Sequence, residues 1–356
     1  MTPLARQFAR RIARHGPMSI ADYMAECLLH PEHGYYATRD PFGRRGDFIT
    51  APEISQMFGE LLGLALAQSW LDQGRPAPFT LAELGPGRGT LMADMLRATR
   101  AVPGFRQAAR VVLVEASRTL RQVQRQTLEG EGVSWLGAAA ELPEAPLFLV
   151  ANEFFDALPI RQFTRAEDGW SERQVALEGE RLVLKLAPPA PLAALEHRLA
   201  DTRPGDIVET CQPALPIVAE LARRIARHGG AALIVDYGGW RSLGDTWQAL
   251  RAHRPEDPLA NPGEADLTAH VDFEPLARAA RAEGAACSSL VPQGVLLERL
   301  GITERARRLA AGMSGARLDA HVAAHRRLTH PQEMGTLFKA LAITPAASPP
   351  PPGFSA

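Results

Sequence analysis

Residues 81–97 read LAELGPGRGTLMADMLR, and this stretch decides the fold. The apolar lead-in, residues 79–84, is typical of a buried strand, whereas Leu91, Met95 and Leu96 after the glycines recur with helical spacing. The glycines between them therefore lie on a strand-to-helix turn. Such a turn places backbone N–H groups at a helix start, where α/β proteins often bind nucleotides.

Strand and helix patterns alternate along the chain on both sides of this turn. The sequence predicts strands at 79–84, 111–115, 147–151 and 231–237, and helices at 90–100, 117–129 and 214–228. This alternation predicts an α/β fold with a mostly parallel, Rossmann-like sheet covered on both faces. Between about 160 and 186 the pattern changes to period two with acidic and glycine turns, which indicates an inserted antiparallel ribbon.

The composition is ordinary for a globular protein, with 46% hydrophobic and 22% charged residues. A formal net charge of -1 and a pI near 6.8 give no global electrostatic footprint of a nucleic-acid or membrane-surface binder. No apolar run approaches the roughly 18 residues that suggest a membrane span. We therefore expect neither a nucleic-acid partner nor a membrane span.

The cysteines indicate a reducing compartment, because Cys27, Cys211 and Cys287 lie far apart and form no CxxC pair. Cys27, His30 and His33 have a spacing that metal ligands can have. No matching second pair of ligands follows them, so we expect no metal site.

The N-terminal stretch TPLARQFARRIARHG, residues 2–16, is rich in arginine and contains no acidic residue. Mitochondrial transit segments share this composition. We favour a structural amphipathic helix that buries Leu4, Phe8 and Ile12. Because arginine and alanine usage is extreme and lysine is scarce, as in GC-rich bacterial genes, the expected location is the bacterial cytoplasm; the mitochondrial matrix is the alternative.

Three kinds of nucleotide site compete for the glycine turn. A P-loop needs a lysine after its last glycine, and Thr90 follows Gly89 instead. The dinucleotide fingerprint is GxGxxG, whereas Gly85, Gly87 and Gly89 give GxGxG. The carboxylate of Glu83, two positions before the first glycine, would repel a pyrophosphate but suits a cation. The implied ligand therefore carries positive charge beside an adenosine.

S-adenosylmethionine, with its amine and its sulfonium, fits this description, and many methyltransferases bind it through an ExGxGxG pattern. Glu115, at the end of the next predicted strand, can accept hydrogen bonds from both ribose hydroxyls. The glycines let the backbone approach the ligand without a clashing side chain. The alternative is a glycine turn that serves only tight strand–helix packing.

Several blocks of the chain resemble the MidA-like methyltransferases. They are GDFITAPEISQMFGELLG (46–63), ELGPGRGTLMADMLR (83–97), ANEFFDALPIRQF (151–163), DPLANPGEADLTAHVDF (257–273) and EMGTLFKALA (333–342). The resemblance implies a Rossmann-like class I methyltransferase sheet. Mitochondrial members of the family are complex I assembly factors that methylate a protein arginine, so it also implies a protein substrate, including a complex I subunit.

The first block extends the expected cofactor site. By resemblance it closes over the methionine end, which makes Gly46, Asp47, Thr50 and Glu53 candidates for cofactor binding. Plain turn and N-cap chemistry is the alternative for Asp47 and Thr50.

The third block follows a predicted strand, so Asn152, Glu153 and Asp156 should lie at the carboxyl edge of the sheet, where a methyl acceptor would bind. Carboxylates there could orient a guanidinium. A structural hydrogen-bonding role for Glu153 or Asp156 stays open, as do the roles of His270 and of Asp236 with Tyr237. The better-known arginine methyltransferases carry two glutamates on a longer hairpin loop, so arginine as acceptor rests on the resemblance.

The chain is expected to divide into a helical N-terminal segment with the cofactor-covering loop (1–75), the cofactor-binding core (76–160), an inserted ribbon and helix lobe (161–230), the rest of the core with C-terminal helices (231–342) and a disordered proline-rich tail (343–356). The expected function is methyl transfer to a protein side chain. The alternatives are a non-catalytic assembly chaperone that keeps the fold, and a small-molecule methyltransferase.

Overall fold

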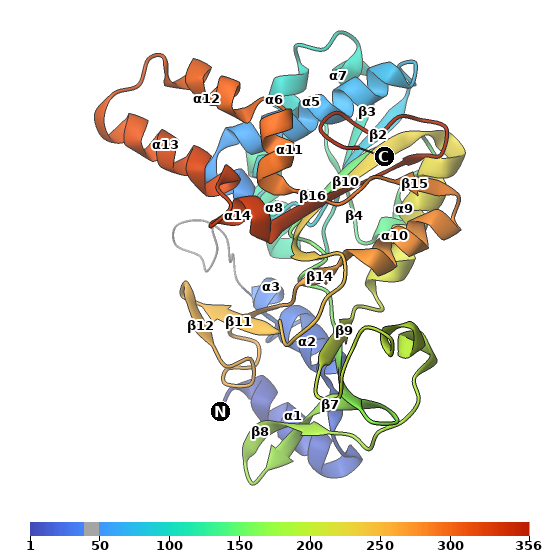
Figure 1. Cartoon of the computed structure of the whole chain (residues 1–356). Helices are drawn as coiled ribbons and strands as arrows, with labels where there is room; N and C mark the ends of the chain where they lie inside the picture. The colour runs from blue at the N-terminus through green and yellow to red at the C-terminus, as the bar shows by residue number, and fades with distance from the viewer. Residues whose placement is uncertain (39–49, 356) are drawn as a thin grey trace.

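The computed structural model describes residues 1–38 and 50–355. An α/β core occupies the upper part of Figure 1, and a smaller lobe that contains the N-terminus lies below it. The C-terminus lies on the core. The expected α/β fold class is confirmed.

The core is built on one sheet whose central strands are parallel. In spatial order the strands are β15 (Ala285–Cys287), β17 (Phe338–Pro345), β10 (Gly230–Gly239), β5 (Leu147–Asn152), β2 (Phe79–Leu84), β3 (Ala109–Val114) and β4 (Ser134–Leu136), with β14 (Val271–Asp272) beside β10 and β16 (Val291–Pro292) beside β17. Only β17 runs antiparallel to its neighbours along this row. All residues of β2 and β5 are buried, which is why these strands read as continuous apolar runs.

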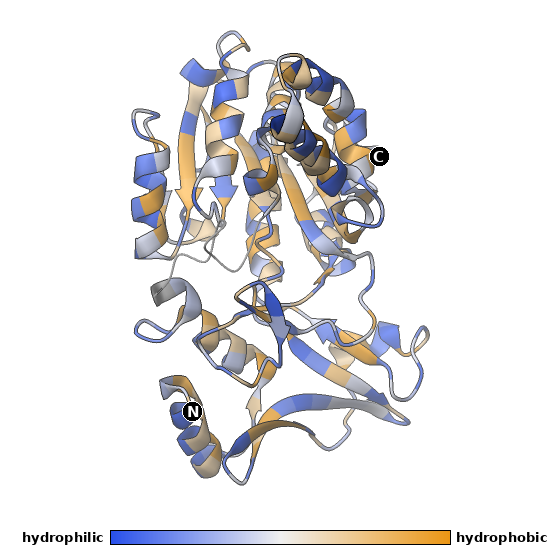
Figure 2. Cartoon of the chain, turned by 90° about the vertical axis from the view of Figure 1, so that its left-hand side faces the viewer, coloured by the Kyte–Doolittle hydropathy of each residue, from blue (hydrophilic) through white to orange (hydrophobic). Residues whose placement is uncertain are grey.

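Helices cover both faces of this sheet. Leu81 points to the cluster under α5 and α6, and its neighbour Ala82 to the cluster under α9 and α10, as strand alternation requires. In Figure 2 the strands of the core are mostly orange and the helices carry blue stretches. The helices of the core are α4 (Ala51–Ile54), α5 (Gln56–Asp72), α6 (Thr90–Thr99), α7 (Phe105–Ala108), α8 (Arg118–Thr127), the 3-10 helix η1 (Ala139–Glu141), α9 (Ala214–His228), α10 (Phe273–Ala282), α11 (Gln293–Arg299), α12 (Ile302–Ala310), α13 (Gly315–Thr329) and α14 (Met334–Leu337).

The lower lobe combines segments that are distant in the sequence. Its elements are α1 (Pro3–His15), β1 (Met18–Ser19), α2 (Ile20–Leu29), α3 (Tyr35–Thr38), the ribbon β6 (Arg161–Ala166), β7 (Gly169–Glu178) and β8 (Arg181–Leu186), the 3-10 helix η2 (Ala193–Arg198), β9 (Ile207–Thr210), and a small sheet of β11 (Gln248–Arg251), β12 (Arg254–Glu256) and β13 (Asp266–Thr268). The antiparallel ribbon is confirmed, and α1 buries Leu4, Phe8 and Ile12 as expected. These three side chains pack with Val175 of the ribbon and Trp247, so one apolar cluster holds the lobe together.

The C-terminal part of the chain differs from the expectation in two places. Residues 338–345 form β17 rather than the end of a helical stretch, because a short, mostly buried apolar run has no period that separates strand from helix. The tail that follows is packed rather than disordered. Arg299 donates to the Gly353 carbonyl at 3.0 Å, and Phe354 packs against the core cluster. Composition alone missed these contacts.

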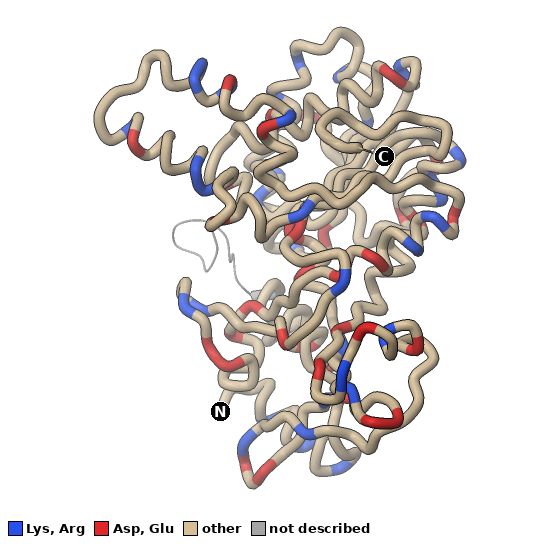
Figure 3. Tube along the Cα trace, viewed as in Figure 1, with Lys and Arg blue, Asp and Glu red and all other residues tan. Residues whose placement is uncertain are grey.

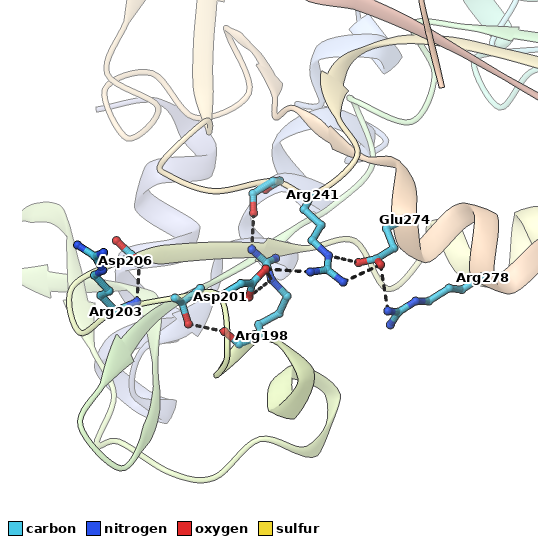
Figure 4. A network of polar contacts seen from close by, with 9 residues as sticks. Arg198, Asp201, Arg203, Asp206, Arg241, Glu274 and Arg278 are labelled. Atoms are coloured by element: carbon cyan, nitrogen blue, oxygen red, sulfur yellow. Dashed lines mark hydrogen bonds and ion pairs between the residues drawn. The ribbon is translucent and has the colours of Figure 1, made fainter. Parts of the chain in front are cut away.

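Charged side chains of both signs are interspersed over the molecule (Figure 3), as the small net charge suggests. One chain of ion pairs joins the lobe to the core (Figure 4): Arg198 and Asp201 lie on the lobe, Arg241 follows β10, and Glu274 and Arg278 lie on α10. Within the described residues, no helix combines the length and the apolarity that a membrane crossing needs.

Candidate active site

The glycine turn lies at the carboxyl end of β2, in the middle of the sheet. From β2 the chain continues to β3 and β4 on one side and to β5 and β10 on the other, so this is the topological switch point where open α/β sheets bind ligands. Gly85, Gly87 and Gly89 all have left-handed backbone, with φ of 59°, 51° and 82°. A Cβ at Gly85 would lie 2.8 Å from the ring of Phe154. The turn therefore needs glycine for its own conformation.

Two cavities meet at this turn, and both are lined by Gly85, Gly87 and Glu153. The larger has a volume of about 530 Å³ and extends past Glu115 to apolar residues of α2 and α9. The smaller, of about 40 Å³, lies against Glu83. Its remaining lining residues are Thr50, Pro52, Glu53, Pro86, Arg88, Thr90, Leu91 and Asn152. Gly89 lines neither cavity. Instead it begins α6 and sits against Leu128.

Glu83 is buried beside the smaller cavity. Its pKa is raised to about 8, mainly by burial and to a smaller extent by the charge of Glu115, while a hydrogen bond from the backbone of Met92 acts in the opposite direction. Its Oε2 atom has no hydrogen-bond partner among the described residues, and the same holds for Oδ1 of Asn152. Both oxygens can accept a hydrogen bond from a ligand, and the carboxylate of Glu83 in particular fits a ligand with a cationic amine.

Glu115 follows β3 and is held in place by two donors. Its carboxylate accepts from the backbone N–H of Ser117 at 2.7 Å and from Nε2 of Gln124 at 3.1 Å, and burial raises its pKa. Gln124 also donates to the carbonyl of Gly87 at 2.8 Å, so one amide ties the acid to the glycine turn. The sequence reasoning missed Gln124. Its signal was a polar residue four positions after Leu120, on the apolar stripe of α8.

Of the four candidates in the first block, the structure describes two. Thr50 and Glu53 both line the smaller cavity, and Glu53 accepts a hydrogen bond of 2.6 Å from Thr90. Thr50 stands at the N-cap of α4 without a side-chain capping bond. Gly46 and Asp47 lie outside the described residues.

Glu153 stands directly after β5 with a φ of 51°, in the left-handed region that non-glycine residues rarely adopt. Its Oε1 accepts from the backbone N–H of Ala51 at 3.3 Å and from Nδ2 of Asn152 at 3.1 Å. Burial, then the charge of Asp156, raises its pKa to about 7. Strained backbone and a carboxylate at the junction of two cavities are features of functional sites.

Asp156 lines neither of the two cavities, whereas Glu153 lines both. Its Oδ2 accepts from the hydroxyl of Tyr237, and burial raises its pKa to about 6. Asp236 is fully buried and accepts from the backbone N–H groups of Phe155 and Asp156 at 3.0 and 3.2 Å. Asp236 therefore holds the turn that carries Glu153.

Two further residues have roles that the sequence left open. The ring of His270 packs edge-on against Tyr237 with centroids 5.4 Å apart, away from the two cavities. Tyr36 was missed: it lines the larger cavity, donates to Asp266 at 2.9 Å, and its carbonyl accepts from the hydroxyl of Ser117. Its only signal was an aromatic pair after a glycine.

This arrangement fits S-adenosylmethionine. The unpaired oxygen of Glu83 beside the small cavity suits the ammonium group, and Glu115 at the next strand end suits a ribose. The glycine backbone between them leaves room for close approach.

Comparison with known proteins agrees with this geometry. Residues 61–291 match the model of a family described as "Putative S-adenosyl-L-methionine-dependent methyltransferase". The chain is 37% identical over 373 residues to the protein arginine methyltransferase NDUFAF7, mitochondrial, of Bos taurus, covering 97% of this chain and 84% of that protein. The Homo sapiens protein of the same name is 36% identical over 379 residues, with 97% and 84% covered.

A solved structure from Burkholderia thailandensis, bound to S-adenosyl-homocysteine, superposes with a TM-score of 0.83 at 30% identity, covering 96% of this chain and 91% of that one. A native crystal structure from the same organism gives a TM-score of 0.80 at 31% identity, with the same coverage. The chain thus belongs to the S-adenosyl-L-methionine-dependent methyltransferase family that residues 61–291 match.

Proposed function

We propose that this methyltransferase modifies an arginine side chain of a protein. The observation that carries the proposal is the carboxylate of Glu153 at the junction of the two cavities, with an unpaired amide oxygen of Asn152 beside it. A planar guanidinium needs such acceptors to be oriented. The curated relatives with 36% to 38% identity carry the name protein arginine methyltransferase, which supports the same acceptor.

The cofactor site would divide between the two cavities. Glu83 would hold the ammonium group and Glu115 the ribose, with Gly85 and Gly87 in close backbone contact. Gly89 would set the direction of α6 behind the turn. Thr50 and Glu53, which line the smaller cavity, would close over the methionine end. A cofactor-binding role for Gly46 and Asp47 is proposed from the family resemblance alone. When bound, the cofactor supplies a methyl group on a sulfonium, whose sulfur keeps the electron pair of the broken bond.

Glu153 would act on the acceptor nitrogen. A guanidinium nitrogen that gains a carbon bond must lose a proton, and a carboxyl group whose pKa is about 7 can take that proton up at neutral pH. Asn152 would accept an N–H of the same guanidinium and fix its plane. Asp156 contributes from behind the cavity wall rather than by contact.

The acceptor protein belongs to respiratory complex I in this proposal, and the place of action is the bacterial cytoplasm. The family resemblance supports the first part. The packed helix α1 supports the second, because it gives the arginine-rich segment a structural role in the lobe. The relatives named above are described as mitochondrial.

The test is Glu153→Gln in a methyl-transfer assay with labelled cofactor, using lysate of a strain that lacks this gene. Glutamine keeps the shape and removes the charge, so calorimetric affinity for S-adenosylmethionine should persist while transfer falls by about a hundredfold or more. The exposed Glu129→Gln is the matched control and should behave as wild type.

Acid hydrolysis of the labelled proteins identifies the product. Methylarginine supports the proposal, whereas another methylated side chain or a labelled small molecule contradicts the acceptor. A wild-type chain that labels nothing yet rescues complex I assembly would favour the chaperone alternative.

A further inference from the structure

Asp156 is buried only three positions after Glu153, on the same turn, yet it lines neither cavity. Its Oδ2 accepts from the hydroxyl of Tyr237, and its Oδ1 has no hydrogen-bond partner among the described residues. A buried carboxylate with a dedicated tyrosine donor, set behind a catalytic candidate, requires a physical role.

The tyrosine is held firmly. Tyr237 lies near the end of β10, the strand that pairs with β5 through Val235 and Asn152. Its ring contacts the rings of His270 and Phe338, with centroids 5.4 and 5.3 Å apart. These contacts come from separate elements, so the direction of the hydroxyl is fixed toward Asp156.

The turn itself is clamped to the same strand. The N–H of Glu153 donates to the carbonyl of Val235 at 2.9 Å, and the carboxylate of Asp236 accepts the N–H groups of Phe155 and Asp156. The left-handed backbone of Glu153 is therefore held by β10. The backbone positions of Glu153 and Asp156 are therefore fixed relative to each other and to β10.

The charges that face this turn come from several elements. The charge of Asp156 raises the pKa of Glu153, and the charge of Arg327 of α13 lowers it. Asp236 on β10 and Tyr36 on α3 lie within electrostatic reach of Asp156. Burial, then the charge of Lys339 of β17, lowers the pKa of His270, whose ring packs against the ring of Tyr237.

We propose that Tyr237 and Asp156 form a positioning pair: the tyrosine hydroxyl keeps Asp156 ionised, and the charge of Asp156 makes the Glu153 carboxylate a stronger base. The inference rests on the proposed function, in which Glu153 takes up the proton of the acceptor nitrogen. A hydrogen bond donated to a carboxylate favours its ionised form, and a nearby like charge favours the protonated form of its neighbour. The pair thereby matches the base to neutral pH.

The test is a direct titration of Glu153 in the cofactor-free chain, by carbon NMR of protein labelled at the glutamate carboxyl carbons. Glu153→Gln identifies the signal. In wild type the midpoint should lie near 7. Asp156→Asn should lower it by about one pH unit or more, the usual size of a close charge effect.

Tyr237→Phe should lower the midpoint too, because Asp156 without its donor protonates at higher pH and loses the charge that acts on Glu153. The control is Tyr23→Phe, which removes the hydroxyl of another buried tyrosine, bonded to the carbonyl of Pro258 in the lobe, and should leave the midpoint unchanged. An unchanged midpoint in Asp156→Asn or in Tyr237→Phe, with the chain still folded, overturns the pair.

Methyl transfer gives a second and separate measurement. Tyr237→Phe should shift the acidic limb of the rate profile to lower pH and reduce kcat, with cofactor affinity unchanged. A shifted Glu153 midpoint without any arginine methylation supports the pair and contradicts the proposed function. Arginine methylation with an unshifted acidic limb in Tyr237→Phe supports the proposed function and contradicts the pair.

Discussion

At the scale of single residues, Glu83 combines burial with an unpaired oxygen. A carboxyl group whose pKa is raised to about 8 by burial is protonated at neutral pH in the free chain. Because the unfolded chain would release that proton more readily, Glu83 lowers the free energy of unfolding as pH rises from about 4.5 to about 8. We infer that Glu83 lowers the stability of the folded chain at neutral pH and in return provides a carboxylate for binding a cation.

An ammonium group favours the ionised form of Glu83, so cofactor binding should release a proton below about pH 8. The affinity for S-adenosylmethionine is then expected to rise from pH 6 to pH 8 and to level off above. Calorimetry in two buffers of different ionisation enthalpy measures the proton release. Glu83→Gln should abolish it and weaken binding about tenfold to a hundredfold, the value of a hydrogen bond to a charged group. Proton release that persists in the variant would assign it to another group.

Two glycines have the same backbone conformation but differ in the space around them, so substituting each of them distinguishes backbone strain from a steric clash. Gly85 and Gly179 have φ of 59° and 61°, but a Cβ at Gly85 would lie 2.8 Å from the ring of Phe154, whereas a Cβ at Gly179 meets nothing within 4 Å. Gly179→Ala should cost about 1 kcal/mol from the left-handed backbone alone. Gly85→Ala should cost more and weaken cofactor binding, because Phe154 lines the larger cavity and must move. Equal decreases in Tm for the two variants would mean that the ring of Phe154 moves aside at little cost in free energy.

At the scale of elements, Glu60 joins three helices. From α5 it accepts bonds from Arg97 of α6 at 3.0 Å and from Arg305 of α12 at 2.8 Å. Burial alone would raise its pKa, but the bonds from these two arginines outweigh burial and the pKa lies below its ordinary value. The contact therefore stabilises the fold fully above the unfolded pKa and loses its effect as pH falls through the lower folded value.

Glu60→Gln should lower the free energy of unfolding by about 1–2 kcal/mol at pH 7, a value reduced by the partial exposure of both arginines. The difference from wild type should shrink below the folded pKa of Glu60, where its charge is lost. Denaturant unfolding at neutral and at acid pH measures both effects. Glu304→Gln is the control, since its ion pair with Arg308 is exposed and should contribute little. A difference that stays constant with pH would exclude the charge as the cause.

At the scale of the whole molecule, the lobe and the core meet through the network of Figure 4. Arg241 bridges Asp201 on the lobe and Glu274 on α10, at 3.2 and 2.6 Å. Arg241→Ala should loosen the lobe, so hydrogen exchange should quicken at residues 193–206 and stay unchanged in β2 and β5. Arg278→Ala, which removes an ion pair within α10, is the control. Uniformly faster exchange would indicate global destabilisation.

The sequence by itself determined the central unit of this protein. The strand 79–84, the glycine turn and the positions of Glu83, Glu115 and Glu153 at strand ends follow from local pattern, because strand period, turn geometry and strand-end placement are set by neighbouring residues. The choice of cofactor followed as well, since the sign of charge required at the turn depends on one residue type. These are short-range properties of the chain.

The tertiary structure alone decided the rest. Residues 338–345 form a strand because they pair with β10 on one side and with β15 on the other. The tail is ordered because Phe354 packs against the core cluster. The sequence suggested that Asp156 contacts the methyl acceptor. In the structure it lines neither cavity and accepts a hydrogen bond from the hydroxyl of Tyr237, 81 positions away in the sequence. Gln124 reaches the glycine turn only through the packing of α8. Long-range contacts of this kind have no local sequence signal, because the free energy that fixes them comes from burial shared with distant parts of the chain.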